Sequence, residues 1–142
     1  MPFFADQSRD QLRRAYVEAW RKRREGRPLE PLEAQIADVI EQHPEYHAML
    51  EDEAALERDF LPEHGQSNPF LHMGLHLAVR DQVATDRPPG IRAVFTALAQ
   101  RLGSGLEAEH RMIECLAEAM WNAQRTGLPP DERAYLERVR RL

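Results

Sequence analysis

Apolar residues recur along this chain at the spacing of a helix, and nowhere do β-branched and aromatic residues alternate with polar ones over the length of a strand. Near the start, Leu12, Tyr16 and Trp20 are four residues apart and line one face of a helix expected over residues 8–24. The pattern therefore predicts an all-α protein.

Proline and glycine divide the rest of the chain into further helical segments. Proline fits the first turn of a helix, whereas the residue before a proline is pushed out of the α region. The expected helices span 31–43, 44–51, 70–85, 91–102, 106–126 and 130–141, with a further turn or two over 52–60 and loops at 62–66, 86–90 and 103–105. We expect a compact bundle of about five to seven helices, forming a single domain over residues 1–142.

The clearest helix start is Asn68-Pro69, because asparagine caps a helix N-terminus and proline suits the first helical position. The helix that follows, 70–85, is apolar around most of its circumference. This pattern is typical of a buried central helix.

Composition narrows the class of protein. A hydrophobic fraction of 42% and a charged fraction of 30% are those of a globular chain. No apolar run approaches the ~20 residues that cross a bilayer, and the first residues lack the basic and apolar segments of a secretory signal. Cys115, the single cysteine, excludes an internal disulfide. We therefore expect a protein of the reducing cytoplasm, without a membrane span.

Charge is unevenly distributed around a net value of -5. Residues 1–29 carry eight Lys/Arg against four Asp/Glu, whereas residues 30–63 carry one Arg against eleven acids. An acidic total argues against nucleic-acid binding, and the basic run at 21–24 suits the C-terminal end of its own helix. One alternative function follows, in which the acidic 30–63 region of a non-catalytic interaction module docks on a basic protein partner.

Histidine spacing provides the main functional lead. His72 and His76 are four residues apart, as are His110 and Glu114, and Glu107 with His110 forms a Glu-x-x-His pair. Residues at i and i+4 lie one above the other on a helix, and Glu-x-x-His offers two metal ligands from one helix in carboxylate-bridged bundles.

The positions of these residues in their helices suggest that they converge. If helix 91–102 runs back antiparallel, helices 70–85 and 106–126 are parallel and carry His72 and His110 at the same end. The leading hypothesis is a metal centre that binds one ion, with Glu107 as a further or bridging ligand. Its predicted ligands are His72, His76, Glu107, His110 and Glu114. Nitrogen and oxygen ligands suit a divalent iron, manganese or zinc ion, and an open coordination position would permit redox or hydrolytic chemistry.

A structural interpretation of the same residues stands beside this one. His72 or His76 paired with Glu107 or Glu114 would be an ordinary satisfied polar pair in a core. Acids such as Glu107 and Glu109 are also favoured in a first helical turn by the helix dipole alone.

The remaining candidates are weaker. Pro44 separates His43 from His47, so that their i,i+4 geometry need not hold, and His64 is expected in a solvated loop. Cys115 lies in an apolar arc and is expected to be inert core.

Several segments also resemble one known family. They are Asn68-Pro69-Phe70-Leu71-His72-Met73-Gly74-Leu75-His76, His43-Pro44-Glu45-Tyr46-His47, Asp86-Arg87-Pro88-Pro89-Gly90 and Glu107-Ala108-Glu109-His110-Arg111. Nearly the whole chain resembles the bacterial family catalogued as domain of unknown function 1841. The resemblance implies a small helical bacterial protein and carries no activity with it.

Overall fold

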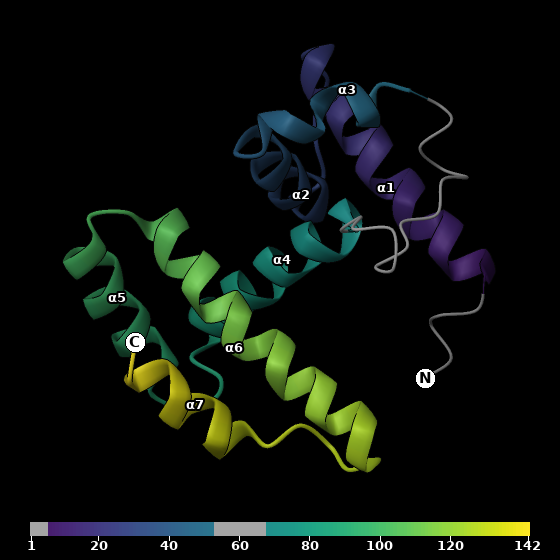
Figure 1. Cartoon of the computed structure of the whole chain (residues 1–142). Helices are drawn as coiled ribbons and strands as arrows, with labels where there is room; N and C mark the ends of the chain where they lie inside the picture. Colours follow the sequence, from purple (N-terminus) through teal and green to yellow (C-terminus); the bar gives the residue numbers. More distant parts are fainter. Residues whose placement is uncertain (1–5, 53–67) are drawn as a thin grey trace. The chain divides into compact units, whose positions relative to one another are not determined.

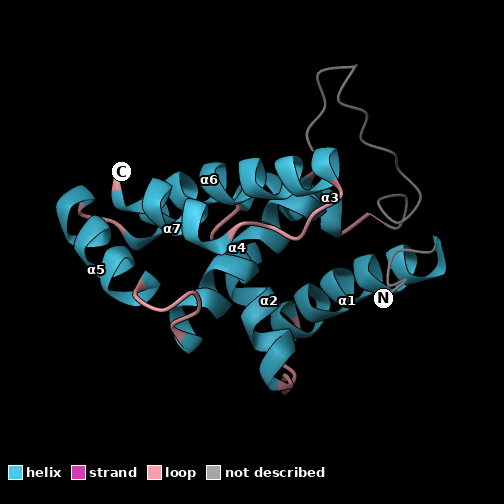
Figure 2. Cartoon of the chain, turned by 90° about the horizontal axis from the view of Figure 1, so that it is seen from below, coloured by secondary structure: helices cyan, strands magenta, loops and turns pink. Residues whose placement is uncertain are grey.

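All regular structure in the described part of the chain is helical (Figure 2). The structure is a computed structural model that describes residues 6–52 and 68–142. Its elements are α1 (Asp6–Arg24), α2 (Pro31–Glu41), the 3-10 helix η1 (Pro44–Tyr46), α3 (His47–Leu50), α4 (Pro69–Thr85), α5 (Ile91–Leu102), α6 (Gly105–Thr126) and α7 (Glu132–Arg140). The all-α prediction is confirmed.

Two compact units make up the chain, residues 1–73 and 74–142. Helix α4 runs without interruption through the boundary and so belongs to both. The expectation of a single domain stays a prediction. The turns expected over 53–60 and the loop at 62–66 lie outside the described residues.

Unit 1 is built on the packing of α1 against α2 (Figure 1). The predicted stripe of α1 is buried at Tyr16 and Trp20, whereas Leu12 is 50% exposed. The other buried apolar residues of these helices and of α3 are Ala19, Ile36, Ala37, Val39, Ile40 and Leu50.

Local backbone constraints set the ends of α2. Glu30 and Glu33 form a reciprocal capping box, in which the backbone N–H of Glu30 donates to Glu33 Oε1 at 2.9 Å. The helix ends at Glu41, two residues earlier than expected. His43 precedes Pro44 and takes φ −127° and ψ 67°, outside the α region, so that the helix must stop before it.

Unit 2 holds most of α4 together with α5, α6 and α7, and the last three contact one another (Figure 1). Their apolar faces enclose one continuous core. It consists of Leu75, Val79, Ile91, Leu98, Ala108, Met112, Ile113, Cys115, Tyr135 and Val139. The core position predicted for Cys115 is confirmed.

Side-chain caps stabilise the N-termini of α4 and α6. Asn68 Oδ1 accepts the backbone N–H groups of Phe70 and Leu71 at 2.9 and 3.2 Å, which confirms the predicted start of α4. Ser104 Oγ accepts the N–H of Glu107 at 3.1 Å and starts α6. Both caps stabilise the first turn of a helix with a candidate histidine in its N-terminal half.

Helix α7 begins two residues later than predicted. Asp131 Oδ1 accepts the N–H of Ala134 at 3.0 Å, so that Asp131 is the N-cap and Pro130 stays outside the helix. The side-chain cap thus determines the start, although proline alone favours an earlier one.

No helix in residues 6–52 and 68–142 combines the length and apolar character needed to cross a membrane.

Candidate metal centre

His72 and His76 lie one turn apart on α4. The helix is continuous from Pro69 to Thr85, so that residues four apart share a face. One ring nitrogen of each lies within 4.8 Å of the other. His76 is fully buried and His72 is half-buried. The predicted i,i+4 pair is therefore present, and it lies away from bulk solvent.

His43 pairs with His72 inside unit 1. Their ring centroids are 5.1 Å apart with the planes at 77°, and one nitrogen of each lies within 4.8 Å of the other. His43 is only 2% exposed, and the contact of its Nδ1 with the carbonyl oxygen of Val39 is 2.7 Å long. Since a carbonyl oxygen only accepts, Nδ1 carries the proton. The ring of Tyr46 stacks on His43 with its centroid 5.5 Å away.

His76 pairs with His110 inside unit 2. Their ring centroids are 4.7 Å apart, the planes lie at 76°, and one nitrogen of each again falls within 4.8 Å of the other. The contact brings an imidazole of α4 next to one of α6, and the α4 residue within unit 2 that makes it is His76. His43 with His72 in unit 1, and His76 with His110 in unit 2, are thus two histidine pairs that each have one member on α4, and these four residues are called the four-histidine group below.

A buried carboxylate lies directly behind His76. Glu109 Oε1 accepts a hydrogen bond of 2.8 Å from His76 Nδ1, and Arg80 donates to the same carboxylate from Nε at 3.0 Å and from Nη2 at 3.1 Å. The side chains of His76, Glu109 and Arg80 are 0%, 9% and 27% exposed. The arrangement is a histidine held by a charge-paired carboxylate.

The electrostatics of Glu109 favour its ionised form. Burial alone would raise its pKa, but the hydrogen bonds from His76 and Arg80 lower the pKa below the ordinary value. Glu109 therefore accepts from both neighbours at neutral pH.

Sequence reasoning missed the role of Glu109, which it assigned to the helix dipole. The available signal was the buried stripe of α6, since Glu109 falls at helical spacing with Met112 and Ile113. A glutamate in such a stripe requires a buried partner.

The two glutamates predicted as ligands lie elsewhere on α6. Glu107 and Glu114 are exposed, and neither belongs to the four-histidine group. Glu107 Oε1 accepts a hydrogen bond of 3.4 Å from Arg111. The structure thus pairs His76 with His110 within unit 2, and it pairs His72 within unit 1 with His43, which was not in the predicted set. The ligand role of both glutamates stays a prediction.

His47 takes part in the packing of unit 1. Its Nε2 lies 2.7 Å from the carbonyl oxygen of Ile40, and its ring lies 4.3 Å from that of Trp20. His64 falls outside the described residues. Burial raises the pKa of the Cys115 thiol, which favours the unreactive protonated form.

Three cations of the basic run pair with four acids in the described part of the acidic segment. Lys22 binds Glu33 at 2.7 Å, Arg23 binds Asp38 and Glu41 at 3.0 and 3.2 Å, and Arg24 binds Glu51 at 3.3 Å. Ion pairs of this kind reduce the charge that either segment presents to a phosphate or a basic partner.

The described residues form an all-α fold. The chain belongs to the family described as Domain of unknown function (DUF1841), which it matches over residues 8–141. Comparison with curated proteins and with solved structures gives no match.

Proposed function

We propose that the protein binds one divalent transition-metal ion through His43, His72, His76 and His110. The observation that carries the proposal is the placement of His72 and His76 one turn apart on α4, each paired with a second histidine of its own unit. Because α4 is continuous, the two pairs share one helical face. Each residue then offers one imidazole nitrogen.

The hydrogen bonds behind two of the rings support a ligand role. His43 donates Nδ1–H to the carbonyl oxygen of Val39, and His76 donates Nδ1–H to Glu109. Metal-binding histidines commonly donate their second ring nitrogen to a carbonyl or carboxylate oxygen, which fixes the tautomer and the ring orientation. The acceptor-only partners assign Nε2 as the ligand atom of both residues.

The donor set favours particular metals. Imidazole suits zinc, copper, iron and nickel, whereas manganese prefers carboxylate and water oxygens. Since Glu107 and Glu114 are exposed and lie outside the histidine group, zinc or iron fits the site better than manganese. Imidazole coordination needs no thiolate, which agrees with a core position for Cys115 and with the expected cytoplasmic location in a bacterium.

Zinc titration of chelator-treated, untagged protein tests the proposal. We expect one equivalent to bind, and the variants His72→Ala and His110→Ala to lose more affinity than the about 10- to 100-fold that an outer-shell partner is worth. The matched control is His47→Ala, whose nitrogen already contacts Ile40. Each variant is checked for folding by circular dichroism. Equal weakening in the control, or the absence of stoichiometric binding, would contradict the proposal.

Three further substitutions on α6 distinguish the roles of its carboxylates. Glu109→Gln should weaken zinc binding by about 10- to 100-fold, because it removes the negative charge that His76 contacts. Glu107→Gln and Glu114→Gln should leave the affinity unchanged. A loss with either of the last two would assign that glutamate as a ligand.

Docking of the acidic 30–63 region on a basic partner is the less favoured function. In the described residues, Glu33, Asp38, Glu41 and Glu51 already pair with Lys22, Arg23 and Arg24. If chelator-treated protein stayed fully folded and bound no metal, the four histidines would be structural and this alternative would gain support.

A further inference from the structure

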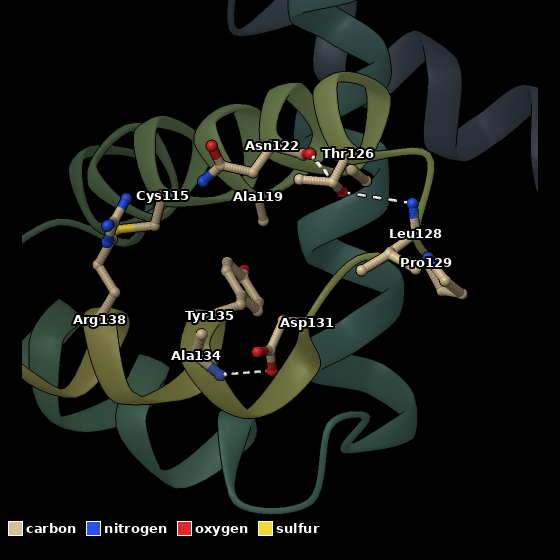
Figure 3. Close-up of a pocket in the computed structure, with 11 residues that line it drawn as sticks. Cys115, Ala119, Asn122, Thr126, Leu128, Pro129, Asp131, Ala134, Tyr135 and Arg138 are labelled. Atoms are coloured by element: carbon tan, nitrogen blue, oxygen red, sulfur yellow. Dashed lines mark hydrogen bonds between the residues drawn. The ribbon is translucent and has the colours of Figure 1, made fainter.

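Unit 2 contains a cavity of about 300 Å³ between α6 and α7 (Figure 3). Its volume is at the lower end of the range of small-molecule sites, about 300–1,000 Å³. Helix α6 provides one wall, α7 the other, and the loop between them closes one end. The cavity is therefore large enough for a compact organic ligand.

The middle of the cavity is apolar. Ala119 and Ala123 face it from α6, and the ring of Tyr135 faces it from α7. At the loop end, Leu128 and Pro129 continue this surface, and Leu128 is 67% exposed. A large apolar side chain at the mouth of an apolar cavity would gain from being covered.

Two of the polar residues that line the cavity form hydrogen bonds with the backbone. Thr126 Oγ1 donates to the carbonyl oxygen of Asn122 at 2.9 Å, and Asp131 caps α7 by accepting from Ala134 at 3.0 Å (Figure 3). These bonds hold the last turn of α6 and the first turn of α7, on either side of the loop.

The end of the cavity opposite the loop carries a positive charge. Arg138 lies there beside Cys115 and is the one cation among the residues that line the cavity (Figure 3). Its guanidinium pairs with Glu118, and both side chains are about half exposed, at 45% and 51%. Exposed pairs of this kind contribute little, and a guanidinium has five donors, so that a second carboxylate can bind to it.

We infer that this cavity binds a small apolar monocarboxylate, with the carboxylate on Arg138 and the hydrocarbon chain extending over Ala119 and Tyr135 to Leu128. The carboxylate provides the anion that matches Arg138, and the chain covers the apolar walls. The inference does not depend on the metal centre, because none of the four histidines lines the cavity.

Binding of octanoate, followed by the backbone amide shifts of Ala123 and Ala134 in two-dimensional NMR spectra, tests the inference. We expect saturable shifts in the wild-type protein and much weaker binding of 1-octanol, which has the chain without the charge. Arg138→Gln should weaken octanoate binding by about two- to five-fold, the value of an ion pair with a half-exposed guanidinium. Arg133→Gln, which changes the same charge on an exposed residue of α7 that does not line the cavity, should leave the affinity unchanged.

Glu118→Gln tests the inference through an expected increase in octanoate affinity. It removes the carboxylate that competes for Arg138, so that octanoate should bind several-fold more tightly. Glu137→Gln makes the same change in net charge on an exposed residue that pairs with Arg140 and should have no effect. Equal binding of octanol and octanoate, equal weakening by Arg138→Gln and Arg133→Gln, or weaker binding in Glu118→Gln would each overturn the inference.

Discussion

Replacement of Glu109 by glutamine in the metal-free protein removes one negative charge from a buried network. The carboxylate accepts from His76 Nδ1 at 2.8 Å and from two nitrogens of Arg80 at 3.0 and 3.1 Å. Glutamine keeps the size of the side chain and one acceptor oxygen, but it turns an amide donor toward a neighbouring donor. The substitution therefore tests the charge of Glu109 with little change in packing.

The expected loss of stability follows from the burial of the network. Removal of one partner of a buried ion pair costs about 3–5 kcal/mol, because the other charge is left uncompensated. His76 is fully buried, but Arg80 is 27% exposed and keeps part of its hydration. We therefore expect the lower end of the range, a decrease of about 3 kcal/mol in the free energy of unfolding.

Urea unfolding followed by far-ultraviolet circular dichroism at neutral pH, with a chelator present, measures this quantity. The control is Glu107→Gln, two residues away on α6, which removes the same charge from an exposed pair with Arg111 and should cost at most about 0.5 kcal/mol. If the two variants were equally stable, the account of the Glu109 network would be wrong.

The same pair of proteins shows a pH dependence of known sign. The folded-state pKa of Glu109 is below its unfolded value, so that the carboxylate stabilises the fold fully above the unfolded pKa and loses this contribution as the pH falls through the folded pKa. The stability difference between wild type and Glu109→Gln should therefore shrink in acid. A difference that stayed constant below the ordinary glutamate pKa would contradict this sign.

Three further predictions concern the framework. Burial raises the pKa of Tyr16 from 10.0 to about 12, so that Tyr16→Phe should flatten the fall in unfolding free energy between pH 10 and 12, and an unchanged slope in urea titrations would contradict this. Asn68→Ala should lower the unfolding free energy by about 1 kcal/mol through loss of the α4 cap, and no change in thermal melting would count against the cap. Met112→Ala should cost about 2–5 kcal/mol because Met112 is fully buried, whereas Met120→Ala, at 39% exposure, should cost much less; equal losses in urea unfolding would refute the assigned core.

Local signals account for most of the fold that could be predicted. Asn68-Pro69 specified the start of α4, because the cap and the proline act within one turn. The start of α7 was wrong by two residues, since Pro130 and Asp131 offer competing starts and only the capping geometry decides between them. The end of α2 was wrong for a similar reason, because His43 is already held outside the α region by Pro44.

The sequence could predict those candidate residues whose relation to each other is set within a single helix. The i,i+4 spacing of His72 and His76 is a local property, and it identified both residues. His43 was judged only against its sequence neighbour His47, although its histidine partner within unit 1 is His72. Helix-dipole reasoning could not distinguish Glu107 from Glu109, because the two differ in which face of α6 they occupy and not in their distance from its start.

X-ray absorption at the zinc edge of the reconstituted protein tests the central claim most directly. We expect four nitrogen ligands at about 2.0–2.1 Å, with the outer-shell scattering of four imidazoles. A first shell dominated by oxygen, or one containing sulfur from Cys115, would contradict coordination by His43, His72, His76 and His110.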